Sequence, residues 1–502
     1  MHIKSIYAMS GEKRAFCPDY CDFVDIWLSR CYNTNAEDGK IFMKTKNIPQ
    51  STEKIRKTTV IAKGRFFEKM INKLKKFLTP VRVIALGFAA VILLGSLLLT
   101  LPLSLKDGVR LSYIDALYTS TSAVCVTGLI SADAGDTFSY FGQTVLMLLI
   151  QIGGLGVTVI GAGVVLAIGK HIDFRGINLI KEGMNLDSAK DVFKLIKSVF
   201  ITTITIELFG AALSFITFSR YYSPGRALFI SLFHSIAAFN NSGFDILGGG
   251  TSLISYNDDV FFNIVTSVLI ILGGIGFPVI REVLKRRFAF KKLSMHSKIV
   301  LTVNAVLLIT GTLLLKITEN ITWLGAFFMS VSSRTAGFSS YNLANFTNAG
   351  LFVIIILMFI GASPGSTGGG IKTTTLFVLL QGIKKSATNR TEKAFKYSVP
   401  RDAYKKASVI TLLGISVSVF GTYLMLVFDP GLTFMQAFFE IVSAFGTAGL
   451  SLGITSSLSV ASKLLSILIM FIGRLGPMTI ATLWSFQDEE RARYPYGNIS
   501  IG

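Results

Sequence analysis

Charged side chains are scarce in this sequence. Only 16% of the 502 residues are Asp, Glu, Lys or Arg, whereas soluble domains carry roughly 25%. Hydrophobic residues make up 51% of the chain, and the mean hydropathy is +0.59. This composition argues against a water-soluble enzyme and favours a chain that lies largely within a membrane.

Cysteine and histidine are also rare, which limits metal and redox sites. Four cysteines are too few for a disulfide-stapled secreted scaffold, and the spacing of Cys17, Cys21 and Cys31 fits no common zinc ribbon. The four histidines are scattered along the chain, whereas a membrane enzyme would need a cluster of such residues near one face. We therefore expect no enzymatic activity and no bound cofactor.

Residues 1–78 lack a continuous apolar segment, so we expect no signal peptide there. We interpret them as a hydrophilic cytosolic region. Disorder and a true start at Met43 both remain open for this stretch.

Acidic residues are outnumbered, 29 against 49 basic ones, which gives a net charge of +20. Such a balance can indicate nucleic acid, but here the basic residues gather in short loops between apolar runs. Loops 170–197, 281–298 and 384–406 hold six, seven and eight Lys or Arg. The positive-inside rule then places these loops and both termini in the cytosol of a multi-pass plasma-membrane protein, with no nucleic-acid partner.

Apolar runs of spanning length recur along the chain, and a helix needs about 20 residues to cross a bilayer. We expect eight spans, and each outer connection holds a further apolar stretch of about half a span, which suits a re-entrant element. The eight spans are residues 83–105, 138–169, 198–219, 260–280, 299–315, 339–371, 407–428 and 464–486, and the half-spans are 113–129, 227–244, 323–338 and 434–450.

These segments predict an all-α polytopic membrane protein in which a unit of helix, re-entrant loop and helix occurs four times. All four units start and end on the cytosolic side, whereas a coupled secondary transporter with inverted repeats would alternate their orientation. That transporter is the rival interpretation. The predicted repeats are residues 79–169, 190–285, 296–385 and 403–486, with a cytosolic tail at 487–502.

Each half-span ends in a small residue, a glycine and then Leu or Phe, a repeat with a long period. Glycine permits a positive φ, so four such loops around one axis could direct rings of carbonyl oxygens at a monovalent cation. Close helix packing is the alternative role for these glycines. The endings centre on Val126, Thr127, Gly128; Asn241, Ser242, Gly243; Thr335, Ala336, Gly337; and Thr447, Ala448, Gly449.

Two further features interrupt apolar runs. Residues 361–375 hold a proline and several glycines, so the helix must break there, either as a functional loop or as a simple kink. Arg474 stands in the middle of the last run, where a charge costs at least about 2.5 kcal/mol unless it faces a polar cavity or partner. Snorkelling to an interface is the alternative for Arg474.

Over about residues 75–486 these motifs resemble the KtrB branch of the Trk/Ktr/HKT potassium transporters. The resemblance rests on 122–129, 239–244, 333–338 and 361–373, read as SAVCVTGL, FNNSGF, SRTAGF and GASPGSTGGGIKT. It implies a single-chain, pseudo-fourfold K⁺ pore, whose filter is formed by the twelve residues of the four endings above. Sodium-permeable plant relatives have a serine at the first filter glycine, where this chain has Gly128.

The same resemblance implies an intramembrane gate, a homodimer and a cytosolic KtrA-type nucleotide-binding ring as regulator. It leaves open a Na⁺-permeable member of the superfamily and Na⁺ as an activator of K⁺ transport. The gate residues it indicates are Gly361, Pro364, Gly365, Gly368, Gly369, Gly370, Lys372 and Arg474.

Five other polar residues have supporting roles in this interpretation. Arg334 braces its loop, Glu207 is paired within the bundle, Glu440 and His234 support their half-spans, and Asp115 complements a helix dipole.

Overall fold

The fold is taken from a computed structural model, which describes residues 80–156, 159–160, 192–388, 393–395, 397–400, 402–477 and 479. The chain divides into two units, Met1–Leu74 and Lys75–Gly502, and every described residue belongs to the second. The expectations for residues 1–78, for loop 170–197 up to residue 191, and for the tail at 487–502 lie outside the described residues. The structure is predominantly helical.

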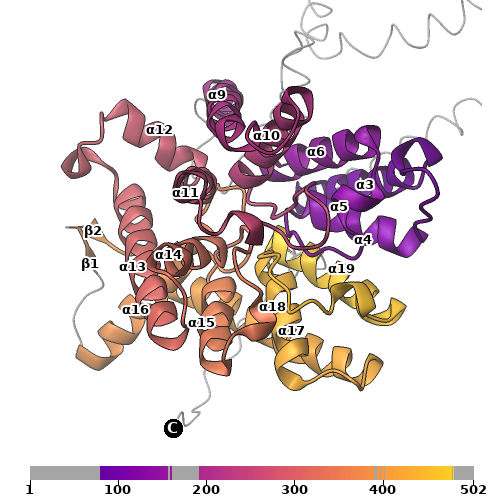
Figure 1. The fold of residues 1–502 in the computed structure, drawn as a ribbon. Coiled ribbons are helices and arrows are strands. Elements are labelled where there is room, and N and C mark those ends of the chain that lie inside the picture. The colour runs from indigo at the N-terminus through magenta and orange to yellow at the C-terminus, as the bar shows by residue number, and fades with distance from the viewer. Residues whose placement is uncertain are drawn as a thin grey trace, which may run out of the picture. The chain divides into compact units, whose positions relative to one another are not determined.

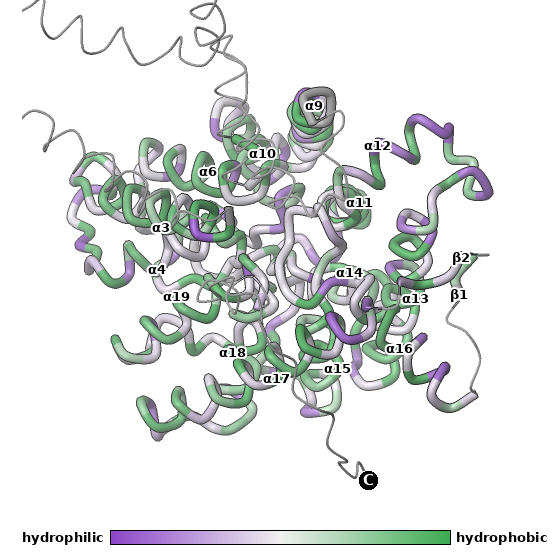
Figure 2. Tube along the Cα trace, turned by 180° about the vertical axis from the view of Figure 1, so that it is seen from behind, coloured by the Kyte–Doolittle hydropathy of each residue, from purple (hydrophilic) through white to green (hydrophobic). Residues whose placement is uncertain are grey.

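Four helices are long and apolar enough to cross a membrane: α3 (Pro80–Leu99), α9 (Val192–Phe218), α13 (Met295–Thr318) and α17 (Ala403–Phe428). Large apolar side chains on each of them are more than half exposed, among them Leu94, Phe209, Ile309 and Phe420. Figure 2 shows hydrophobic residues along these helices. A water-soluble surface would not carry so many, so these faces fit lipid contact.

After each long helix comes a short one that begins close to where the sequence predicts a half-span: α4 (Tyr113–Val124), α10 (Pro224–Phe239), α14 (Trp323–Ser332) and α18 (Phe434–Gly446). Side chains of Ser112, Thr322 and Thr433 accept a hydrogen bond from the first turn of their helices and so fix these starts. Each short helix ends before its glycine and continues as irregular chain.

The second apolar helix of each repeat is shorter than the sequence indicates: α6 (Tyr140–Leu155), α11 (Val260–Ile275), α15 (Asn348–Phe359) and α19 (Val460–Leu475). At 1.5 Å per residue, 16 residues reach about 24 Å, less than the roughly 30 Å of a hydrocarbon core. Among the described residues, four helices have spanning length, or five if α11 is joined to α12 (Phe277–Lys285) across a 100° bend. The break within 339–371 agrees with the sequence-based expectation, the bend at Gly276 within 260–280 does not, and the parts of spans 138–169 and 464–486 beyond residues 160 and 479 lie outside the described residues.

The remaining elements are short connections and the segment after α15. The chain forms α16 (Thr373–Thr388), which begins in the third predicted repeat and ends in the predicted basic loop 384–406. Within that loop lies an antiparallel pair, β1 (Lys393–Ala394) with β2 (Tyr397–Ser398). The others are η1 (Pro102–Ser104), α5 (Ala134–Thr137), η2 (Ile254–Tyr256), η3 (Phe290–Lys292), η4 (Leu343–Asn345) and η5 (Thr455–Ser457).

Within residues 75–502 the helices follow one another around a common centre in chain order (Figure 1). One contact recurs between the long and the short helix of a repeat. A Cβ added at Gly95, Gly210 or Gly311 would lie 2.4–2.5 Å from the hydroxyl of a serine on α4, α10 or α14. These glycines therefore let the helices approach closely in the same way three times.

Candidate functional site

The four glycine loops share one backbone pattern. In each, the residue two places before the glycine has a positive φ, 56° at Val126 and 80° at Thr335, and the glycine itself follows with φ between 68° and 94°. Non-glycine residues with positive φ are uncommon and cost of order 1–3 kcal/mol, so four at equivalent places indicate a conformation that packing enforces. Asn241 and Thr447 complete the set.

The four glycines contact one another in a closed order. A Cβ at Gly128 would lie 2.4 Å from the carbonyl oxygen of Ser242, and one at Gly243 would lie 2.7 Å from that of Ala336. One at Gly337 would lie 2.9 Å from the Ala448 oxygen, and one at Gly449 would lie 2.1 Å from the Thr127 oxygen. Each loop thus packs against the next, and the fourth packs against the first.

Buried polar groups hold these loops from behind. The backbone N–H of Gly128 donates to Ser122 Oγ at 3.0 Å, and the side chains of Asn241 and Thr335 join neighbouring loops at 3.2 Å. Behind the second loop, Glu207 accepts hydrogen bonds from Asn240 at 2.9 Å and from Gln151 at 3.3 Å. The expected pairing of Glu207 within the bundle is thus with two amides from α6 and the end of α10.

Residues 360–372, which we call the crossing loop, separate α15 from α16. The two ends of the loop pair through Ile360 and Ile371. Lys372 Nζ donates to the carbonyl oxygens of Gly368 at 2.7 Å and Gly369 at 3.4 Å, so the loop folds around its own lysine. Pro364 and the glycines prevent a helix here, as the sequence predicts.

The crossing loop lies directly against the glycine loops. Gly369 N–H donates to Thr447 Oγ1 at 2.9 Å, and a Cβ at Gly368 would lie 2.2 Å from Thr335 Oγ1. Gly361 contacts the far end of the same loop, since its Cβ would lie 2.2 Å from the Gly369 oxygen. The loop is therefore packed beneath two of the four endings.

Arg474 is the polar link between this loop and α6. Its guanidinium donates to the carbonyl oxygen of Thr367 in the crossing loop and to those of Gly153 and Gly154 at the end of α6. The expectation that a central arginine needs a polar partner holds. A side chain snorkelling to an interface would not have these three acceptors.

Two cavities lie on opposite sides of the glycine loops. One of about 490 Å³ is lined by Gly128, Gly243, Gly337 and Gly449 together with the loops that follow them. The other, of about 210 Å³, is lined by residues of the crossing loop, including Gly365 and Lys372, and by Arg474. The loops and the crossing loop thus separate two spaces large enough for hydrated ions.

A family model described as cation transport protein, TrkH, matches residues 58–298 and 290–492. The chain belongs to this family. The resemblance inferred from the motifs is confirmed at that level, and with helices of spanning length the chain is a multi-pass membrane protein. The family transports ions, and nothing in the match indicates catalysis.

The chain is similar to individual members of the TrkH family along most of its length. It is 38% identical to the Ktr system potassium uptake protein B of Bacillus subtilis, over 84% of this chain and 97% of that protein. It is 36% identical to the potassium/sodium uptake protein NtpJ of Enterococcus hirae, over 86% and 99%. The crystal structure of TrkH from Vibrio parahaemolyticus matches with a TM-score of 0.62, 21% identity and coverage of 80% and 84%, which supports the fold.

The sequence did not predict how the second apolar helices, which we call the inner helices, end in this TrkH-family chain. Helices α6, α11 and α19 stop at Gly156, Gly276 and Gly476, whose φ values are 86°, 100° and 88°. A Gly-x-x-Gly pattern precedes each stop, and its repetition at Gly153 and Gly273 was the available signal. The first glycine of each pattern lets the helix touch the residue before a glycine loop, as a Cβ at Gly273 would lie 1.8 Å from the Phe239 oxygen.

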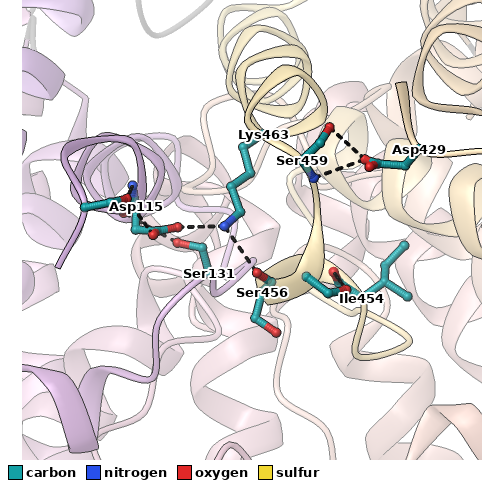
Figure 3. A network of polar contacts seen from close by, with 9 residues as sticks. Asp115, Ser131, Asp429, Ile454, Ser456, Ser459 and Lys463 are labelled. Atoms are coloured by element: carbon teal, nitrogen blue, oxygen red, sulfur yellow. Dashed lines mark hydrogen bonds and ion pairs between the residues drawn. The ribbon is translucent and has the colours of Figure 1, made fainter. Parts of the chain in front are cut away.

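Asp115 does more than complement a helix dipole. Figure 3 shows Lys463 of α19 reaching across to Asp115 of α4, with 2.8 Å between Nζ and Oδ1. Lys463 also donates to the carbonyl of Ser456, while Asp429 accepts from Ser459 nearby. This ion pair joins α4 to α19, between residues 348 positions apart in the sequence.

Glu440 and His234, expected to support their half-spans, both form buried side-chain hydrogen bonds. Glu440 of α18 accepts from Thr455 at 2.5 Å and from Ser451 at 2.8 Å, and so ties the short helix to the chain that follows its glycine. His234 of α10 is bonded to Thr266 of α11 at 3.0 Å. Both contacts brace a short helix against its own repeat.

Proposed function

We propose that this chain takes up K⁺ across the cytoplasmic membrane through a pore along the axis of its four glycine loops. The observation that carries the proposal is the closed order of contacts from Gly128 to Gly449, because it brings four equivalent backbone segments around one line. Potassium is the ion named for the Bacillus relative.

The twelve residues of the four endings would form the selectivity filter. Carbonyl oxygens of Thr127, Ser242, Ala336 and Ala448 each lie beside the glycine of a neighbouring loop, so they come from all four repeats at one level. Rings of such oxygens replace the hydration shell of a monovalent cation. The C-terminal ends of the four short helices, which carry partial negative charge, point toward the same region and favour a cation there.

The crossing loop would serve as the gate. It lies between the glycine loops and the 210 Å³ cavity, and Arg474 and Lys372 place two positive charges on that route. Its glycines keep several backbone conformations close in energy, which suits a segment that alternates between blocking and open positions. On this basis we propose these gate residues: Gly361, Pro364, Gly365, Gly368, Gly369, Gly370, Lys372 and Arg474.

Orientation and assembly follow the charge pattern and the relatives. Basic loop 281–298 supports a cytosolic side for the ends of the repeats, with both termini inside. Two Bacillus subtilis relatives are named as proteins of a Ktr system, which supports a chain that works within a larger assembly. We propose a homodimer under control of a cytosolic nucleotide-binding ring, embedded in membrane lipid.

A second candidate is a pore that passes both K⁺ and Na⁺. The Enterococcus relative, 36% identical, is named a potassium/sodium uptake protein. Gly128 has no side chain and favours K⁺ in our interpretation. The ratio of K⁺ to Na⁺ transport by the wild-type chain therefore decides between the candidates.

The test is growth on low K⁺, with Rb⁺ uptake, in cells that lack their own K⁺ uptake systems. Wild-type chain should restore both. Gly128→Ser should weaken discrimination against Na⁺, because its Cβ would displace the Ser242 carbonyl 2.4 Å away. Gly431→Ser is the matched control, since nothing lies within 4 Å of a Cβ there. No uptake by the wild-type chain overturns the function, and an unchanged Na⁺ effect in Gly128→Ser removes this residue from the filter.

A further inference from the structure

A buried chain of hydrogen bonds runs from the third glycine loop to the crossing loop. Arg334 precedes Thr335 directly, and its Nη1 donates to Asn304 Oδ1 of α13 at 2.6 Å. Asn304 Nδ2 donates to Ser363 Oγ at 3.0 Å, and Ser363 Oγ lies 3.1 Å from Thr373 Oγ1 at the start of α16. All four side chains are at most 7% exposed.

Asn304 is the side chain of this network that bonds both Arg334 and Ser363. Within the described part of the chain, its oxygen is the one acceptor of the Arg334 side chain, whose Nε has no partner. An asparagine amide offers an acceptor and a donor on one rigid group, so both bonds depend on one orientation of the amide. The same Nδ2 also donates to the Val300 carbonyl oxygen of α13 at 2.7 Å. A shift of Ser363 with the crossing loop would therefore leave the amide held by its own helix alone and loosen the position of the oxygen that faces Arg334.

Loss of the bond to the Asn304 oxygen would be energetically unfavourable for the buried guanidinium of Arg334. A buried charge that loses its partner costs several kcal/mol, so the guanidinium would follow the Asn304 oxygen or seek other carbonyls. The residue after it, Thr335, has a positive φ of 80° and a hydroxyl that contacts Asn241 of the neighbouring loop. Displacement of Arg334 is thus transmitted directly to two of the four loops.

We propose that Asn304 is a positioning residue that couples the crossing loop to the glycine loops, so that ion discrimination depends on the position of the gate. This inference rests on the proposed function, because it assigns the two loops to gate and filter. It adds that the gate controls selectivity as well as flux, through Arg334, Asn304 and Ser363.

The test compares variants at both ends of the chain of bonds. Ser363→Ala lies in the crossing loop, yet it should change the ratio of the Na⁺ inhibition constant to the Rb⁺ KM by about fivefold, equivalent to about 1 kcal/mol. Asn304→Leu should do the same, and the double variant should add little because both remove one connection. Asn304→Asp should restore the ratio, since its carboxylate accepts from both Arg334 and the Ser363 hydroxyl.

Two control variants and one measurement without transport complete the design. Thr310→Ala and Thr312→Ala each remove a hydroxyl on α13 that, among the described residues, bonds only backbone carbonyls of the same helix. Both should leave the ratio within twofold of wild type, whatever happens to the maximum rate. In purified protein, the rise in Tm caused by K⁺ relative to choline should fall in Asn304→Leu and recover in Asn304→Asp.

The outcomes separate the two proposals. Absence of wild-type Rb⁺ uptake rejects the proposed function, and the K⁺-dependent Tm then decides the inference alone. With normal wild-type uptake, an unchanged ratio in Ser363→Ala, or equal behaviour of Asn304→Leu and Asn304→Asp, overturns the coupling.

Discussion

Arg474→Ala removes a side chain that ties the crossing loop to α6, and its effect can be estimated from the contacts. When the loop moves away, the bond to the Thr367 carbonyl breaks, whereas those to Gly153 and Gly154 can persist. A hydrogen bond from a charged donor contributes about 1.5–3 kcal/mol. Water in the 210 Å³ cavity can replace part of it, so the lower end of that range applies.

A loss of about 1.5 kcal/mol shifts the balance between blocked and open loop about tenfold toward open. We therefore expect a rise of up to about tenfold in the maximum rate of Rb⁺ uptake where opening limits the rate. The apparent KM should fall as well, because a positive charge leaves the ion route. Arg474→Lys keeps the charge and loses the bridging geometry, so it should raise the maximum rate with a smaller change in KM.

Uptake kinetics at matched amounts of protein in the membrane provide the assay. Arg220→Ala is a suitable control, because this arginine is 61% exposed and lies 3.9 Å from Asp259, away from the crossing loop. A maximum rate in Arg474→Ala that stays within twofold of wild type, or falls below it, refutes the tether.

Three other predictions use the same structure. Lys292→Cys should resist impermeant thiol reagents added to intact cells and react in inverted vesicles, and labelling from outside reverses the orientation. Asp115→Asn and Lys463→Met should each lower the unfolding free energy by about 1–2 kcal/mol, because the ion pair is only partly exposed. The double variant should lose less than the sum of the two, so additive Tm shifts contradict this ion pair. Gly276→Ala should raise Rb⁺ leak more than Gly156→Ala does. Both glycines have a positive φ, but of the two only a Cβ at Gly276 would meet the crossing loop, 2.7 Å from the Pro364 oxygen. Equal leak in the two variants contradicts this contact.

The short helices could be predicted closely from local signals. Three of them start at the residues that the sequence indicates, 113, 323 and 434, because a Ser or Thr stands immediately before the apolar stretch and caps the helix. The glycine endings were predictable for a similar reason, since four matches at long period are hard to produce by chance.

The inner helices could not be read from hydropathy. The apolar run at 260–280 continues past Gly276 without a charge until Arg281, so it has the composition of an unbroken span. What breaks it is a backbone conformation at Gly276, stabilised by contacts with a loop almost ninety residues later. The partners of Asn304 and Asp115 could not be predicted for the same reason, because tertiary packing brings together residues that lie at least 30 positions apart in the sequence.

The shortened inner helices and the crossing loop depend on each other. A helix that stops early leaves carbonyl groups without intrahelical donors, and in a membrane such groups must find partners within the protein. The crossing loop supplies them at α11, where Ser363 and Thr367 donate backbone N–H groups to Gly274 and Gly273, and Arg474 supplies them at α6. Unbroken helices would bond these carbonyl groups within the helix, and the crossing loop would then have no binding site beneath the four glycine loops. In the gate proposed above, the same bonds would be exchanged for water when the loop moves, and the 210 Å³ cavity lined by Gly365 and Lys372 provides the space for that water.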